Sequence, residues 1–180
     1  DIIKGDEIHM LKKIKTIPVL LRIVAALCAV AAFCMMFADQ ISFVVTSILG
    51  GGETTVSIFG DADADLKPVT GAIVGYIIIL VGALIPVITA LFIDNKTVDL
   101  IGVALGVIAV VVGVVLVFNV VELFKTANNV SDGSLGSLAS ATYKVLAAPI
   151  VAGILGIVAA AADALSLVFP TAKAKKKKKK

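Results

Sequence analysis

The sequence predicts an all-α membrane protein: a four-transmembrane-helix bundle with cytoplasmic N- and C-termini and a short β-hairpin in the first extracellular loop. Hydrophobic residues make up 59% of the chain and charged residues only 16%, and the charges lie almost wholly outside four apolar blocks. Each block is apolar on every face, as a helix surrounded by lipid is. The distribution of lysines between the connections gives the orientation.

Each apolar block is long enough to cross about 30 Å of hydrocarbon as a helix. Pro86 lies inside the second block, where it predicts a kink or a freed carbonyl group. Together the blocks and their connections form one predicted transmembrane domain, residues 17–169. The predicted spans are 17–37, 70–93, 100–121 and 145–169.

The two long connections, residues 38–69 and 123–144, are the predicted exterior loops. In the first, β-branched runs at 43–49 and 54–59 lie on either side of three consecutive glycines. That pattern predicts a β-hairpin. The second loop has a centre rich in serine and glycine, which predicts a flexible segment.

Lysines predict the orientation of the chain. The N-terminal flank (1–16), the 94–99 turn and the C-terminal tail (170–180) hold twelve lysines, whereas the two long loops hold three. Because cytoplasmic segments carry an excess of lysine, we expect both termini in the cytoplasm of a multi-pass protein of the cell (plasma) membrane. Within the basic flank, Met10 resembles a native start.

Seven of the last eight residues are lysines, and without them the chain is acidic. The net charge of +3 is therefore a terminal feature, and no nucleic-acid partner is expected. We expect the lysine tail to bind anionic lipids, at about 1 kcal/mol per lysine near the surface. A disordered end that sets the topology is the alternative.

Six glycines recur at the same spacing in the second and third spans. Small residues let helix backbones approach closely in lipid. If the two spans fold about the 94–99 turn, Gly82 lies level with Gly113, and the two GxxxG pairs do not meet. We therefore expect at least one pair to pack another span or another copy, with packing inside one bundle as the alternative. The glycines are Gly71, Gly75, Gly82, Gly102, Gly106 and Gly113.

Arg22 and Asp163 are the ionisable residues most clearly within apolar blocks. Both lie near the predicted cytoplasmic ends of their spans. Leaving either unpaired in hydrocarbon costs about 2.5–3.5 kcal/mol. We therefore expect Arg22 and Asp163 to form an intramembrane ion pair that places the first and fourth spans side by side. The alternative is that Arg22 reaches the headgroups while Asp163 faces a water-filled vestibule.

Three acidic residues in the first loop, Asp61, Asp63 and Asp65, resemble the opening of a calcium loop. Leu66 and Ala72 stand where such a loop needs glycine and glutamate, so we expect a weak exterior cation site at most. The single histidine lies in the N-terminal flank, and no phosphate-binding motif is present. No metal site, cofactor, catalytic residue or enzymatic activity is therefore predicted.

The predicted order of spans and loops is similar to that of claudin-like four-span proteins, with inner termini, a larger first exterior loop with strand character and a shorter second one. Those families carry a tryptophan and paired cysteines in the first loop. This chain has no tryptophan, and neither of its two cysteines lies in a loop. The resemblance therefore covers the span order and implies no junction function.

These observations favour a non-enzymatic interaction or scaffolding unit in the bilayer, or a subunit of a membrane assembly. Its expected partners are copies of itself or another membrane protein, with the 38–69 loop as the recognition surface. The alternative is a small channel or carrier for ions or small solutes, with Asp163 as its intramembrane carboxylate. Polar residues within the spans are isolated, and a conduit needs a continuous polar track, so the scaffold is favoured.

Overall fold

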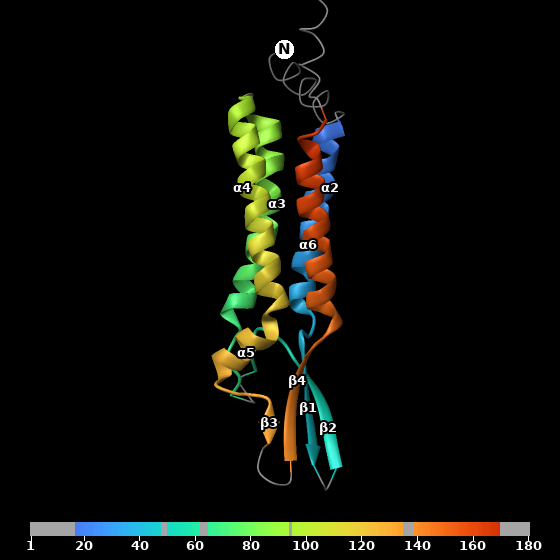
Figure 1. The fold of residues 1–180 in the computed structure, drawn as a ribbon, viewed down its shortest axis with the longest axis vertical. Coiled ribbons are helices and arrows are strands. Elements are labelled where there is room, and N and C mark those ends of the chain that lie inside the picture. Colours follow the sequence, from blue (N-terminus) through green and yellow to red (C-terminus); the bar gives the residue numbers. More distant parts are fainter. Residues whose placement is uncertain (1–16, 48–49, 62–64, 94, 135–138, 170–180) are drawn as a thin grey trace, which may run out of the picture.

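The computed structural model describes residues 17–47, 50–61, 65–93, 95–134 and 139–169. These residues form a long bundle of helices with a small antiparallel sheet at one end (Figure 1). The elements in chain order are α2 (Ile17–Cys34), the 3-10 turn η1 (Met35–Phe37), β1 (Ile41–Ser47), β2 (Gly50–Val56), α3 (Thr70–Phe92), α4 (Lys96–Phe118), α5 (Val120–Asn128), β3 (Gly133–Ser134), β4 (Ala139–Val145) and α6 (Ala147–Ser166).

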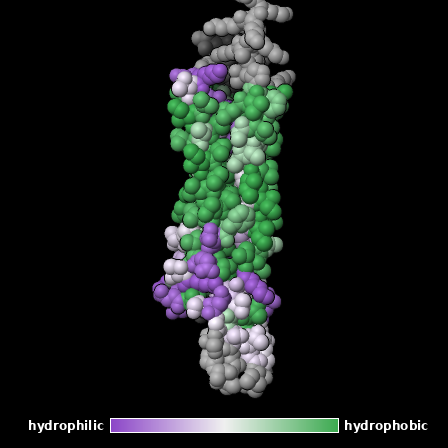
Figure 2. Space-filling view, in the orientation of Figure 1, coloured by the Kyte–Doolittle hydropathy of each residue, from purple (hydrophilic) through white to green (hydrophobic). Residues whose placement is uncertain are grey.

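Four segments of the described chain are long and apolar enough to cross a membrane: α2 with η1, α3, α4 and α6. Hydrophobic side chains cover the surface along the bundle, and hydrophilic ones gather at its two ends (Figure 2). The predicted bundle of four long apolar helices is thus confirmed, and four such helices indicate a multi-pass membrane protein. The third span begins at Lys96, earlier than expected.

The spans form two antiparallel pairs, with α3 along α4 and α2 along α6, and α4 packs along α6 to join them (Figure 1). α2 begins and α6 ends at the end of the bundle where α3 is connected to α4. We call this the Arg22 end. The other end carries the strands and is called the sheet end. This arrangement agrees with the expected placement of both long loops on one side.

Glycines set the close contact between α3 and α4. Gly75 packs against Gly113, and Gly82 packs against Gly106. A Cβ on Gly106 would lie 2.6 Å from the Gly82 carbonyl oxygen, so the two backbones leave no room for a side chain. The expectation that Gly82 lies level with Gly113 is wrong. The pairing fits a hairpin folded between Phe92 and Lys96 instead of about residues 94–99.

The other glycines of the pattern face side chains of the same chain. Gly71 packs against the Leu123 side chain, and Gly102 packs against the Thr89 side chain. Pro86 lacks an N–H group, so the Gly82 carbonyl loses its helical donor on the side where Gly106 approaches. The glycine pattern therefore serves packing between neighbouring spans in the described chain.

Both long loops contribute to one sheet, whose strand order is β2-β1-β4-β3 with antiparallel neighbours. The predicted hairpin in the first loop is present as β1 and β2, but the three glycines belong to β2 and not to the turn. The serine- and glycine-rich centre of the second loop, expected to be flexible, lies partly in strands where the structure describes it. The described residues of this loop form the end of α5, β3 and β4, because β4 finds a long partner in β1.

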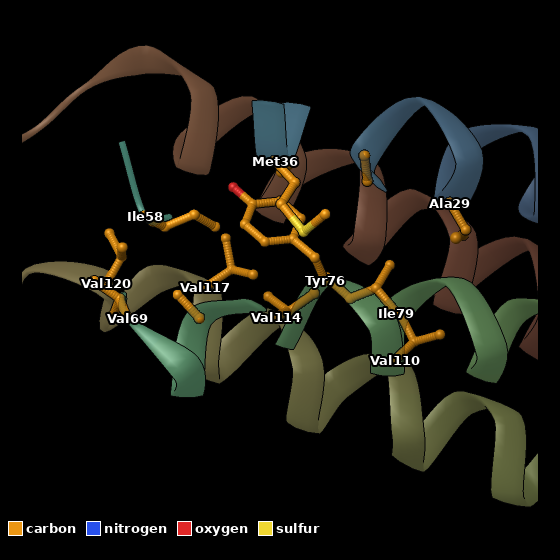
Figure 3. Packing of buried hydrophobic residues seen from close by; sticks show 14 of the residues in the cluster. Ala29, Met36, Ile58, Val69, Tyr76, Ile79, Val110, Val114, Val117 and Val120 are labelled. Atoms are coloured by element: carbon orange, nitrogen blue, oxygen red, sulfur yellow. The ribbon is translucent and has the colours of Figure 1, made fainter. Parts of the chain in front are cut away.

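Buried side chains concentrate where the bundle meets the sheet. Tyr76 of α3 lies at the centre of this region, with Met36 and Ile58 on one side and Val114 and Val117 on the other (Figure 3). Ile58 and Val69, from either end of the segment that follows β2, are almost fully buried here. The segment between β2 and α3 is therefore part of the bundle core, and it anchors the sheet to the helices.

Candidate functional site

Arg22 of α2 is the centre of a buried polar cluster at the Arg22 end, with only 2% of its surface exposed. Its Nη1 donates to Asp99 Oδ1 at 2.5 Å and to the Pro86 carbonyl at 3.1 Å. Its Nη2 donates to Asp99 Oδ2 at 3.0 Å, and its Nε donates to Ser166 Oγ at 3.0 Å. One guanidinium thus binds groups from α3, α4 and α6.

Asp99 reaches Arg22 because α4 begins earlier in the chain than the predicted third span. Asn95 caps the helix by accepting a hydrogen bond from Thr97 N at 3.0 Å, so Asp99 lies in the first turn. A carboxylate in that position also interacts favourably with the positive end of the helix dipole. The two-pronged contact with Arg22 is the geometry in which guanidinium–carboxylate pairs are strongest.

The predicted ion pair between Arg22 and Asp163 is absent from the described structure. α2 and α6 do lie side by side as expected, but Arg22 pairs with Asp99. Asp163 is fully buried, and neither of its carboxyl oxygens has a hydrogen-bond partner among the described residues. Ser166 lies between them, because its Oγ accepts from Arg22 and donates to the Asp163 carbonyl at 2.7 Å.

Gln40 joins the sheet to the bundle at the sheet end, and its surface is fully buried. Its Nε2 donates to the carbonyls of Met35 and Ala38, and its Oε1 accepts from Tyr76 Oη at 2.6 Å. Its main chain bonds to Val56 of β2 and to Leu146, which precedes α6. Every polar group of this buried side chain is satisfied, which holds the strands in one position on the helices.

α5 covers one side of the sheet through Tyr143 of β4. The Tyr143 ring stacks on Phe43 with centroids 5.0 Å apart and lies 5.6 Å from Phe124 of α5. At the edge of this contact, Lys125 Nζ donates to Asp132 Oδ2 at 2.5 Å, and Asp132 Oδ1 accepts from Tyr143 N at 2.9 Å. These contacts tie α5 to β4.

The hydrogen bond from Lys125 holds the pKa of Asp132 below its usual value, and the same bond raises the pKa of Lys125. A carboxyl group whose pKa is lowered in the folded state stabilises that state at pH values above the group's ordinary pKa. That contribution is lost as the pH falls through the lowered pKa. Both groups lie outside the spans, so this ion pair is complete at neutral pH, and it is lost in acid when Asp132 gains a proton and in alkali when Lys125 loses one.

β2 forms the outer edge of the sheet on the first-loop side, and its residues from Gly50 to Thr55 are exposed. Neither proline nor lysine, two residues that commonly block an edge strand, lies in this strand, and its one charged side chain, Glu53, accepts a hydrogen bond from Ser42 of β1. A shallow hollow of about 230 Å³ lies on the face of the hairpin, bounded by Phe43 and Val45 of β1 and by β2. The edge and the hollow are adjacent.

The predicted acidic cation site is only partly within the described chain. Asp63 lies outside it, Asp61 forms an isolated bridge with Leu66, and Asp65 adopts a positive φ of 52°. Among the residues placed by the structure, no group of three or more His, Cys, Asp or Glu is arranged to hold a metal ion. The lysine tail, with its expected contact to anionic lipid, and the N-terminal flank also fall outside the described residues.

Sequence reasoning missed Asp99, Ser166 and Gln40 as partners in buried networks. For Asp99 a signal was available, because asparagine is a common residue immediately before a helix and acidic residues are common in the first turn. Ser166 and Gln40 are ordinary polar residues in the sequence, and only the fold brings their partners to them. Comparison with protein-family models and with curated proteins found no match to the chain.

Proposed function

We propose that this protein is a non-enzymatic interaction unit of the membrane, which presents its sheet as a recognition surface and assembles with a second copy of itself through the edge of β2. The observation that carries the proposal is the edge strand β2, exposed from Gly50 to Thr55, on a sheet built from both long loops. Edge strands bind other chains by pairing main-chain groups, and neighbouring side-chain hollows add specificity.

The rigid mounting of the sheet supports this function. Gln40 and Tyr76 fix the strands to the helices, and Tyr143 fixes them to α5. A surface held in one position loses little conformational freedom when a partner binds, and so more of the interaction energy appears as affinity. The hollow between Phe43 and β2 offers an apolar contact beside the edge.

Replacing Gly52 with lysine should block pairing at the edge. A Cβ at this position meets nothing within 4 Å, so the fold accommodates the side chain, and a charge on an edge strand opposes strand addition. Two differently tagged full-length copies, co-expressed and extracted in mild detergent, should co-purify. We expect G52K to reduce co-purification about tenfold, which corresponds to about 1.4 kcal/mol.

Thr126→Lys is the matched control, because it places the same charge on the exposed side of α5. It should co-purify as the unaltered protein does. The proposal is wrong if unaltered copies do not associate, or if T126K weakens association as much as G52K does.

A further inference from the structure

Asp163 is a fully buried carboxyl group for which the structure provides no donor. Its two oxygens have no hydrogen-bond partner in the described chain, whereas Asp99 holds a two-pronged contact with Arg22. A buried ionised carboxylate without donors or a counter-ion is strongly disfavoured. The packed structure therefore fits the neutral, protonated form of Asp163.

The charges on the neighbouring helices lead to the same result. The elements α2, α3, α4 and η1 pack against α6. Of these, α2 carries Arg22, and α4 carries Asp99 and the exposed Lys96, whereas the described residues of α3 and η1 carry no charge. Arg22 and Asp99 neutralise each other. An ionised Asp163 would leave one net negative charge in the buried cluster, and Arg22 is the cation that acts on it among the described residues.

We propose that Asp163 is a proton-binding site, and that Arg22 turns from Asp99 toward Asp163 when the proton leaves. In this step the O–H bond of the Asp163 carboxyl breaks, the proton passes to water, and the guanidinium compensates the new carboxylate. Four hydrogen bonds to described residues engage Arg22, and a guanidinium has five N–H groups, so one donor without a partner among the described residues is left for the exchange.

Neighbouring groups suit this exchange. Ser166 already connects Arg22 to the main chain of Asp163. Thr89 Oγ1 lies 3.1 Å from the Pro86 carbonyl and 3.2 Å from Asp99 Oδ1, and so remains as a donor to Asp99 when Arg22 turns away. The buried residues beside Asp163 on α6 include alanines at 159, 160 and 162, which offer no side-chain oxygen to a metal ion.

Infrared spectroscopy of the full-length protein in lipid nanodiscs tests the first part of the proposal. At neutral pH we expect a carboxylic C=O band that shifts in D₂O and disappears in one step in alkali. Asp163→Asn should remove this band. Glu122→Gln should keep it, because the Glu122 side chain is 71% exposed and lies outside the buried cluster. A spectrum without the band in the unaltered protein would overturn the proposal.

Asp99→Asn tests the exchange. This variant keeps Asp163 but frees Arg22, so Asp163 should ionise and the band should be lost at neutral pH. Arg22→Gln should have the opposite effect, so that the band persists to higher pH than in the unaltered protein. If D99N does not fold, R22Q tests the same coupling between Arg22 and Asp163. A band that persists in D99N, or is lost earlier in R22Q, would contradict the exchange. Loss of the band on adding sodium at constant pH would assign the site to a metal cation instead.

Discussion

Arg22→Met is expected to destabilise the folded bundle by about 3 kcal/mol, the lower end of the range for removing one partner of a buried ion pair. The substitution leaves the Asp99 carboxylate without its cation and the Ser166 hydroxyl without a donor, and it removes one of the two side-chain donors to the Pro86 carbonyl. Because the Asp99 side chain is 20% exposed, water relieves part of the cost. Thermal unfolding in detergent, followed by circular dichroism, measures the effect.

Two further variants show whether the loss comes from the pair itself. Arg22→Met combined with Asp99→Leu should recover most of the stability, since apolar side chains of similar volume often replace a buried pair without loss. Lys125→Met removes a cation that interacts with exposed carboxylates, and should lower the unfolding temperature much less than Arg22→Met does. Equal melting of R22M and the unaltered protein would contradict the assignment, as would additive losses in the double variant.

Gly106→Leu is expected to cost about 3 kcal/mol, the upper end of the range for overpacking a tight contact. The new side chain would meet the Gly82 carbonyl oxygen at 2.6 Å and the Pro86 ring at 2.8 Å. Neither can move aside without displacing α3, and a shift of α3 also moves the Pro86 carbonyl away from Arg22. The same unfolding measurement in detergent reports the loss.

Ala104→Leu is the control for this variant, because it adds the same side chain on an exposed face of the same helix. We expect its stability to remain within about 0.5 kcal/mol of the unaltered protein. If both substitutions were equally harmful, the close contact between α3 and α4 would not be the cause.

The spans were predictable because long apolar runs have few alternatives to crossing lipid as helices. The hairpin of the first loop was also predictable from its β-branched residues. The second-loop strand was not, because Ala139–Val145 follows a Ser/Gly-rich stretch and becomes a strand only beside β1. Strand formation here depends on a partner more than ninety residues away.

Only part of the buried cluster around Arg22 could be predicted from the sequence. Hydropathy alone identifies Arg22 and Asp163 as costly in lipid, which made a pair between them the simplest solution. The structure instead uses Asp99, which sequence reasoning had assigned to a polar turn, because α4 starts at Lys96. The same shift of the helix start changes which glycines face each other. One misplaced boundary thus accounts for both errors.

Single cysteines in a variant without Cys28 and Cys34 test most directly whether the bundle separates the sheet from the Arg22 end. Suitable positions are the exposed residues Thr54 of β2, Thr142 of β4 and Thr97 of α4. A membrane-impermeant thiol reagent added to sealed vesicles should label the cysteines at 54 and 142 alike, and the one at 97 only from the opposite side. Labelling of the cysteines at 54 and 97 from the same side would contradict the four-span arrangement and the exterior sheet with it.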